Sequence, residues 1–367
     1  MTTPVSTLDL LPTDIETDLR ASLRGLLADR CDPAAVTALY DGDRSVVAPL
    51  WKALTVELGL AELLVPENQG GAGASAREAA VVLEELGRAV APTPFLTSAV
   101  IATTALLDSE SPLLGELAAG RHTAALLVPL STPPDAPLAT VDADADGRLS
   151  GSVTSVAGVL EADVLLVLVE TPDGLAMYAV DADLVTVQPV VSLDMTRQLA
   201  DVSLAGVQAE RVLIGAEPAV RRALMTGAAL LASEQVGVAR WCLEETVSYL
   251  KVRTQFGRLL GSFQALKHRL ADLYADVESA SAAAVYAAAA TSSGHPDAAV
   301  ATHVAQAYCS DLAVHAAEEA IQLHGGIGMT WEHPAHLYLK KAKADQIALG
   351  TAGGHRARLA ELIDLEA

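Results

Sequence analysis

The sequence predicts an α+β fold in which a β-rich segment separates two helical ones. Residues 1 to about 120 and about 217 to 367 repeat apolar side chains every three or four positions, the period of an amphipathic helix. Residues 121 to 216 instead hold short apolar and β-branched runs between turn sequences. We therefore expect an N-terminal α-helical domain (1–120), a central small β domain (121–216) and a C-terminal α-helical bundle (217–367).

Helical spacing and prolines define the elements of the N-terminal domain. Pro49 stands where a first helical turn tolerates a residue without an amide hydrogen. Pro92 and Pro94 end the helix that precedes them. The expected helices cover residues 21–28, 49–60, 77–90 and 96–107.

The central segment has the pattern of short strands joined by turns. Turn sequences occur at residues 144–147 and 172–174. We interpret Asp142, Asp144 and Asp146 as a solvated turn, because no twelve-residue calcium loop follows them. The expected strands lie within residues 124–130, 164–169, 176–180 and 200–204.

Two short motifs interrupt the C-terminal helices. Arg253-Thr254-Gln255-Phe256-Gly257 joins two helical stretches, although a helix hairpin needs only the glycines. A guanidinium binds phosphate with planar, bidentate hydrogen bonds, and an aromatic ring beside it can cover a flat cofactor. In Gln322-Leu323-His324-Gly325-Gly326-Ile327-Gly328, the glycines let the backbone approach a ligand closely. Together the motifs suggest a site for a dinucleotide pyrophosphate, although each alone is also typical of a helix end.

Composition excludes several classes of function. The net charge of −22 argues against nucleic acid as a partner, because phosphate backbones require clustered Lys and Arg. We expect no membrane span, and the start of the chain lacks the features of a signal peptide, so we expect a cytoplasmic protein. The three cysteines are widely spaced, which favours buried thiols over disulfides or zinc.

With these motifs in this order, the chain resembles the acyl-CoA dehydrogenase family. The resemblance covers nearly the whole chain and includes Leu50-Trp51, Val65-Pro66-Glu67 and Glu84-Glu85-Leu86-Gly87-Arg88. It implies an FAD-dependent oxidoreductase that desaturates an acyl-CoA thioester at its α,β-carbons. It also implies an N-terminal α domain, a β domain and a C-terminal four-helix bundle, with an electron-transferring flavoprotein as the acceptor.

The usual catalytic base of the family is missing. The resemblance places the base in a Glu before a Gly-Thr pair, and here Leu349 precedes Gly350-Thr351. The alternative family position, on the helix before the first motif, corresponds to Gly227. The Thr-Glu-Pro and Gly-Ser-Asp stretches that hold the flavin ring are also absent near residues 128–135, although residues 153–156 can stand for the next flavin-contacting strand.

The losses suggest a subunit that works with a non-identical partner. In the family, one FAD is shared between subunits, and the two C-terminal motifs reach the adenosine diphosphate portion from the neighbour. By this resemblance Arg253 and Gln255 bind the pyrophosphate, Phe256 packs against the cofactor, and Gln322, Gly325 and Gly326 hold the adenosine end. We therefore expect a hetero-oligomer, of the kind that some bacteria use on steroid side-chain or fatty acyl thioesters, in which the partner supplies the catalytic Glu.

Several alternatives stay open from the sequence. One is a homo-oligomeric dehydrogenase with a relocated base. Glu234 is the preferred candidate for that base, and Glu244 and Asp345 are weaker candidates. A flavin monooxygenase of the same fold and a flavin-free acyl-binding scaffold are others. We expect no metal site, because the polar group of His324, Glu332, His333 and His336 is more typical of a surface or interface.

Overall fold

The computed structural model describes residues 8–365. Its N-terminal part is helical, as expected. Two helices begin at capping boxes, in which Thr13 pairs with Glu16 and Ser75 with Glu78. The expected helix at 96–107 is a π-helix, Phe95–Ala102, continued by a short α-helix. The α-helices are α1 (Asp14–Arg30), α2 (Pro33–Ala38), α3 (Val47–Lys52), α4 (Ala76–Arg88), α5 (Thr103–Leu106) and α6 (Leu113–Ala118).

The central segment forms two four-stranded sheets, with strand orders β1-β4-β5-β8 and β2-β3-β7-β6. Strand β4 is apolar from residue 164 to 169 because its alternate faces join different cores. Leu166 and Leu168 face the helices, while Leu165 and Val167 face the other sheet. The strands are β1 (Ala124–Leu126), β2 (Asp142–Ala143), β3 (Leu149–Ala157), β4 (Val164–Thr171), β5 (Gly174–Asp181), β6 (Thr186–Pro189), β7 (Leu199–Val207) and β8 (Glu210–Ile214).

The expected strands match β1, β4, β5 and β7, and the strand suggested at residues 153–156 lies within β3, whereas β2, β6 and β8 were not expected. The first expected run was too long, because β1 ends at Leu126. In the turn at 144–147, the Asp144 carboxylate accepts hydrogen bonds from the amides of Asp146 and Arg148. These bonds account for Asp144 as a turn residue.

The C-terminal part is built on three long helices, α7 (Glu217–Val252), α8 (Gln264–Ser293) and α9 (Ala298–His324). A small hairpin, β9 (Thr254–Gln255) and β10 (Arg258–Leu259), joins the first two. The shorter α10 (Ala335–Asp345) and α11 (Ala352–Leu362) follow. Together with the two preceding parts this is the α+β architecture expected from the sequence.

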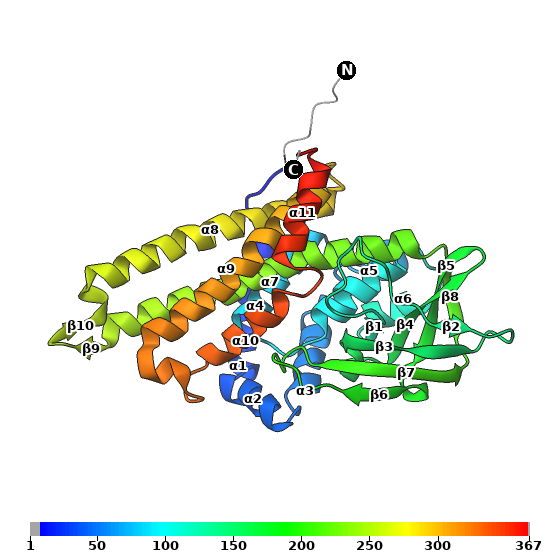
Figure 1. Ribbon diagram of the computed structural model, residues 1–367, viewed down its shortest axis with the longest axis horizontal. Coiled ribbons are helices and arrows are strands. Elements are labelled where there is room, and N and C mark those ends of the chain that lie inside the picture. Colours follow the sequence, from blue (N-terminus) through cyan, green and yellow to red (C-terminus); the bar gives the residue numbers. More distant parts are fainter. Residues whose placement is uncertain (1–7, 366–367) are drawn as a thin grey trace, which may run out of the picture.

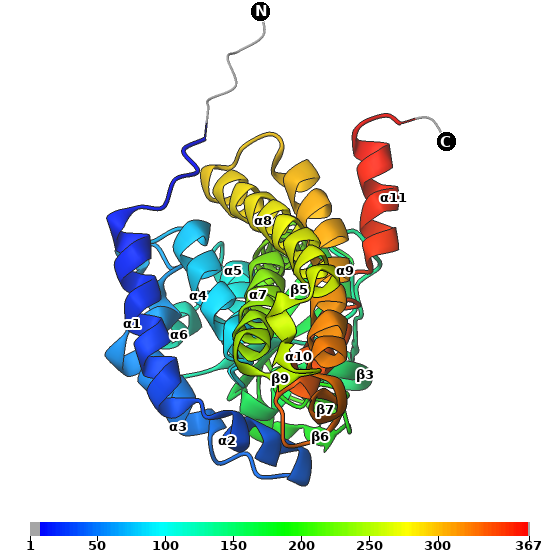
Figure 2. The same cartoon turned by 90° about the vertical axis from the view of Figure 1, so that its left-hand side faces the viewer.

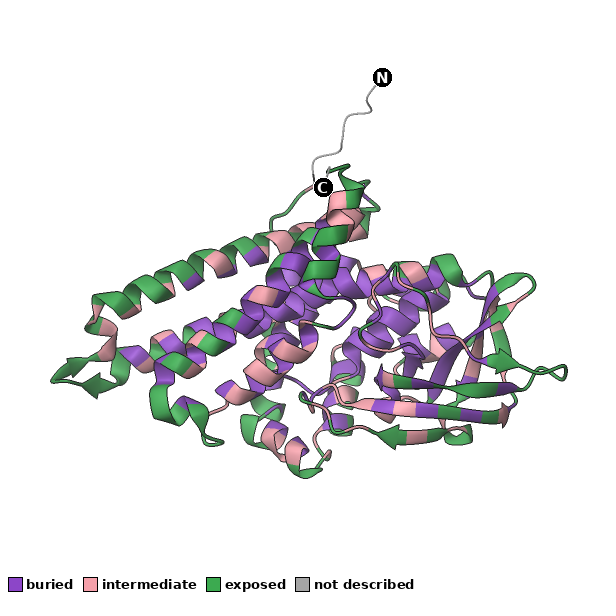
Figure 3. Cartoon of the chain, in the orientation of Figure 1, coloured by how far each residue is buried: buried purple, intermediate pink, exposed green. Residues whose placement is uncertain are grey.

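The hairpin and the sheets lie at opposite ends of the elongated molecule (Figure 1). Viewed from the hairpin end, α7 runs through the middle, with α4, α8, α9 and α10 around it (Figure 2). Buried residues concentrate where these helices meet, whereas the hairpin and the outer strands are exposed (Figure 3). Among residues 8–365, none of the helices combines the length and hydropathy that a bilayer-spanning segment requires.

Candidate functional site

The fold brings the two C-terminal motifs together at one end of the helical bundle. Helix α7 ends just before Arg253, and α9 ends at His324, which precedes Gly325. The ring of Tyr249 on α7 lies 4.4 Å from the ring of His324, centroid to centroid, and its hydroxyl donates to the His324 carbonyl at 3.5 Å. The two motifs, 69 residues apart from Arg253 to Gln322 in the sequence, therefore share one surface.

Side chains of the first motif point outward from the hairpin. Arg253 and Gln255 are exposed, and the Phe256 side chain is 86% exposed although it is aromatic. Phe256 has a φ of +53°, so the turn holds a residue with a side chain in the left-handed region. Its ring meets Phe263 edge-on, and the Arg258 guanidinium lies 3.8 Å from the Phe263 centroid.

The second motif presents open backbone beside an exposed amide. Gln322 is exposed on the last turn of α9. Gly325 has a φ of +65°, and a Cβ built on Gly325 or Gly326 would meet no atom within 4 Å. A ligand can therefore approach this backbone without displacing other parts of the chain.

The two positions at which the resemblance predicts a catalytic base, Leu349 and Gly227, lie next to each other in the core. Leu349 is 1% exposed. A Cβ added to Gly227 would lie 3.2 Å from Leu349 Cδ1 and 2.8 Å from Ile101 Cγ1. The cavity that remains, lined also by Thr97 and Leu224, measures about 20 Å³, which is room for about one water molecule. Aliphatic side chains thus fill most of the space around Leu349 and Gly227.

Glu234 belongs to a buried cluster of charges. Its two carboxylate oxygens accept from Arg197 at 2.5 Å and from Lys341 at 2.7 Å. Burial favours the neutral acid, but the charges of Arg197 and Lys341 outweigh it and hold the pKa of Glu234 below its usual value. Both oxygens are engaged and the group stays ionised, which suits an ion-pair role better than proton abstraction from carbon.

The two weaker candidates for a relocated base, Glu244 and Asp345, have other surroundings and other partners than Glu234. Glu244 forms a surface ion pair with Arg88. Asp345 accepts from Arg197 at 2.6 Å, while its second oxygen has no hydrogen-bond partner. Burial raises the pKa of Asp345 to about 6, although Lys341 and Arg197 oppose that shift.

A larger cavity lies between the β domain and the end of α10. Its volume is about 350 Å³, and Asp345 and Arg197 stand at its polar side. Ser155, in the stretch expected to stand for a flavin-contacting strand, lines it together with Leu130 and Ile347. Residues from four segments of the chain meet here, and the segment at 190–199, which contributes Arg197, was not singled out from the sequence.

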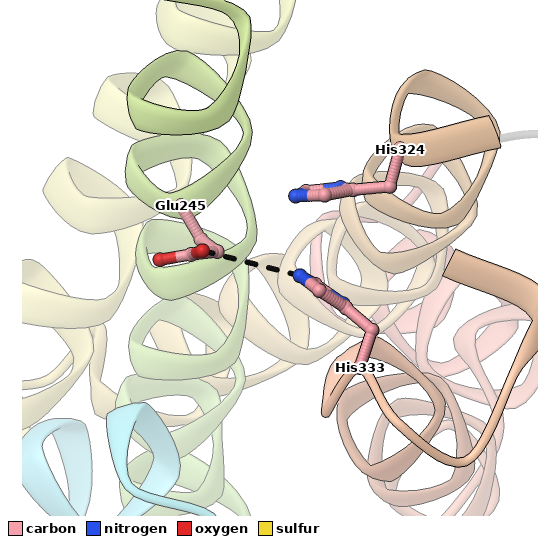
Figure 4. Close-up of side chains that lie close together, drawn as sticks. All are labelled: Glu245, His324 and His333. Carbon is pink, nitrogen blue, oxygen red and sulfur yellow. Dashed lines mark ion pairs between the residues drawn. The ribbon is translucent and has the colours of Figure 1, made fainter. Parts of the chain in front are cut away.

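The cluster of polar side chains near the second motif contains different residues from those expected. The structure brings Glu245 of α7, rather than Glu332, to His324 and His333 (Figure 4). His336 instead packs against Trp331, with ring centroids 4.5 Å apart. Sequence spacing missed Glu245 because it precedes His324 by 79 residues and approaches only through the packing of α7 on α9.

Comparison with known families matches both helical parts of the chain. The acyl-CoA dehydrogenase N-terminal domain matches residues 13–109, and the acyl-CoA dehydrogenase C-terminal domain matches residues 215–363. Acyl-CoA dehydrogenase IpdE2 of Mycobacterium tuberculosis is 38% identical over 88% of this chain and 89% of its own length. Acyl-CoA dehydrogenase FadE34 of the same organism is 34% identical over 93% of this chain but only 47% of its own length.

Solved structures give the same result. The Tcur3481-Tcur3483 steroid ACAD, solved as a variant, superposes with a TM-score of 0.82 at 30% identity, covering 96% of this chain and 98% of that one. A chain of the ChsE4-ChsE5 complex from Mycobacterium tuberculosis has a TM-score of 0.86 at 27% identity, covering 98% and 100%. The chain therefore belongs to the acyl-CoA dehydrogenase family, whose members are FAD-dependent oxidoreductases.

Proposed function

We propose that this acyl-CoA dehydrogenase family member is the non-catalytic subunit of a heteromeric acyl-CoA dehydrogenase, and that its exposed hairpin completes the FAD site of a catalytic partner. The observation that carries the proposal is the closed core around Leu349, Gly227 and Ile101. Neither family position offers a carboxylate, and the space beside them cannot receive an acyl chain. The catalytic Glu and the acyl pocket then belong to the partner.

The exposed motifs fit the role of completing a partner's site. FAD supplies the hydride acceptor of the reaction, and its pyrophosphate requires a cation. The exposed Arg253 guanidinium suits that group, Phe256 offers an uncovered ring, and Gly326 leaves the backbone accessible. Along α7, Gly227 precedes Val252 by 25 residues, which corresponds to about 38 Å of helix. The exposed motifs are therefore remote from Gly227 and Leu349.

Two structural neighbours support a partnership of unlike chains. Both are named as pairs of chains, Tcur3481-Tcur3483 and ChsE4-ChsE5, and the first pair is a steroid ACAD. FadE34 is about twice as long as its matched region, which leaves room for a second unit of this size in one chain. We therefore propose a bulky acyl-CoA, such as a steroid side-chain thioester, as the substrate of the complex, with an electron-transferring flavoprotein as its acceptor.

The first test is native mass spectrometry of the chain with excess FAD, alone and with the catalytic subunit that co-purifies with it. We expect substoichiometric flavin alone and full loading in the complex. In the complex, Arg253→Ala should weaken FAD retention roughly ten- to hundredfold, because it removes charge-assisted hydrogen bonds. Arg211→Ala, at an exposed position on β8, is the matched control and should retain FAD. A homo-oligomer that holds one FAD per chain and turns over acyl-CoA would overturn the proposal.

A self-sufficient homo-oligomer is the second candidate, and Asp345 gives it a specific basis. Asp345 combines a free carboxylate oxygen with a pKa of about 6 at the edge of the 350 Å³ cavity. If the protein alone has activity, Asp345→Asn and Glu234→Gln identify which carboxylate removes the proton. Activity that survives both substitutions rules out each as the base.

A further inference from the structure

Three potential metal ligands converge where α7, α9 and the segment before α10 meet. Glu245 comes from α7, His324 is the last residue of α9, and His333 follows the second motif (Figure 4). One ligand atom from each lies within 4.8 Å of the other two. His333 Nε2 lies 3.9 Å from Glu245 Oε1. No two of these ligands come from the same helix, so the cluster is a product of tertiary packing.

His324 carries an unpartnered acceptor inside this cluster. The side chain is 3% exposed, and its Nδ1 lies 2.7 Å from the Ala320 carbonyl, which can only accept. The proton is therefore on Nδ1, and Nε2 holds a lone pair. That Nε2 atom is buried without a hydrogen-bond partner and points toward Glu245. Such an atom costs free energy unless it has a ligand.

His333 offers a second ring nitrogen to the same space. Its Nε2 faces Glu245 (Figure 4), while Nδ1 accepts a bond of 3.3 Å from the Ala335 amide. Binding a metal through Nε2 requires the ring proton to be on Nδ1, where it would face the Ala335 N–H. That long bond is then lost, and the ring must turn away from the amide.

We propose that Glu245, His324 and His333 form a binding site for a divalent transition metal ion, with zinc as the best match. Two imidazole nitrogens and one carboxylate are a known zinc ligand set, and a fourth position stays open to water. Zinc–ligand distances of about 2.0–2.1 Å require the ligand atoms to approach one another by roughly 1 Å. The Glu245 side chain, 42% exposed, has room to make that movement.

The ion would tie together three segments beside the second motif. It joins α7 and α9 through Glu245 and His324, and it fixes the segment that follows Gly325 and Gly326 through His333. This proposal is independent of the subunit role, because its ligands all belong to this chain.

Cobalt titration followed by visible absorption tests the site, using Co²⁺ as a spectroscopic probe and Zn²⁺ as a competitor. We expect the purified protein, alone or with its co-purifying subunit, to bind one Co²⁺ per chain and to release it to Zn²⁺. Glu245→Gln and His333→Ala should each weaken binding by more than the 10–100-fold that is typical of removing a neighbour of a ligand. Both sites are partly exposed, so these variants should fold where a His324 variant could fail.

His268→Ala is the control, because it removes an exposed imidazole near the start of α8. It should leave Co²⁺ affinity unchanged. Absence of saturable binding in the unmodified protein would overturn the proposal. Equal binding by the unmodified protein and the two ligand variants would overturn it as well, since surface histidines would then account for the signal.

Discussion

At the scale of single residues, the buried charges show how little sequence position says about role. Glu234 was the preferred relocated base, yet it lies among Arg197, Lys341, Asp345 and Asp194, all of them buried. The cluster has two positive and three negative side chains. Each cation therefore compensates more than one carboxylate, and removing one leaves buried charge without compensation.

Lys341→Met tests this dependence. The substitution keeps the side-chain length but removes the charge that faces Glu234 and Asp345, so we expect a loss of roughly 3–5 kcal/mol in the free energy of unfolding. Urea unfolding at pH 7 measures it. Lys343→Met, which breaks a solvent-exposed pair with Glu318, should cost no more than about 1 kcal/mol. Similar losses in both variants would contradict the assigned importance of burial.

A second residue-scale feature is the buried pair His303 and His355. The His355 Nε2–H donates to the Leu349 carbonyl at 3.2 Å, so its Nδ1 accepts from His303 Nδ1–H at 2.8 Å. Protonating His355 would set two N–H groups against each other. Burial and this neighbour lower the pKa of His355 to about 4.

This pair predicts acid sensitivity. Above pH 6.5 both the folded and the unfolded chain keep His355 neutral, so its contribution does not vary with pH. Between pH 6.5 and about 4 the unfolded chain binds the proton first, and we expect stability to fall by up to about 3 kcal/mol. Urea midpoints measured across this range should fall less steeply in His355→Gln. His122→Gln, at an exposed histidine, should keep the original slope; an unchanged slope in His355→Gln would contradict the prediction.

At the scale of elements, the contact between α4 and α7 depends on two glycines. A Cβ on Gly237 would lie 1.9 Å from the Glu84 carbonyl oxygen, and a Cβ on Gly87 would lie 2.1 Å from the Glu234 carbonyl oxygen. Because each glycine lacks a Cβ, the backbone of the other helix can approach it closely. This close approach also sets the position of Glu234 within its cluster.

Gly237→Ala should therefore destabilise the protein by at least about 1–3 kcal/mol, because backbone atoms must move apart. Thermal unfolding and the yield of folded protein measure the effect. Gly115→Ala on α6 is the matched control, since its Cβ would meet nothing within 4 Å. Alanine favours a helix over glycine there by up to about 1 kcal/mol, so loss of stability in both variants would contradict the packing argument.

At the scale of the whole molecule, the motifs and the sheets are separated by the length of the helical bundle. Helix α7 alone, with 36 residues, spans about 54 Å. The hairpin end exposes Phe256, Met329 and Trp331 at 86%, 81% and 61%. If these side chains form one patch with the hairpin, a partner chain that covers it would remove them from water.

Hydrogen–deuterium exchange can locate that surface. If the hairpin end meets the catalytic partner, amides in residues 254–262 should exchange more slowly in the complex than in the isolated chain. The turn at residues 144–147, at the other end of the molecule, should not change. Protection of that turn with an unprotected hairpin would place the interface elsewhere and contradict the proposed sharing of FAD.

The sequence predicted the order of helical and β-rich parts because that order depends on local periodicity and turn residues. It did not predict β2, β6 and β8, which are short and contain no buried residue, so they lack the apolar pattern by which a strand is predicted. The prolines after residue 90 marked the end of α4 to within two residues, since that signal acts within one turn. The expected helix at 21–28 covered only the later part of α1, which begins at Asp14 behind the Thr13–Glu16 capping box. The assignments of Arg253, Gln255 and Gln322 to FAD stay predictions.

By itself, the sequence determined the family, because the motifs that carry the resemblance are local patterns of residues. The assignment of Leu349 and Gly227 to the positions of a lost catalytic base stays a prediction. Only the tertiary structure decided that Leu349, Gly227 and Ile101 close the same space, that Glu234 is neutralised by Arg197 and Lys341, and that Glu245 reaches His324. These facts depend on contacts between residues far apart in the chain. No local pattern encodes such contacts, because they arise from the packing of whole helices.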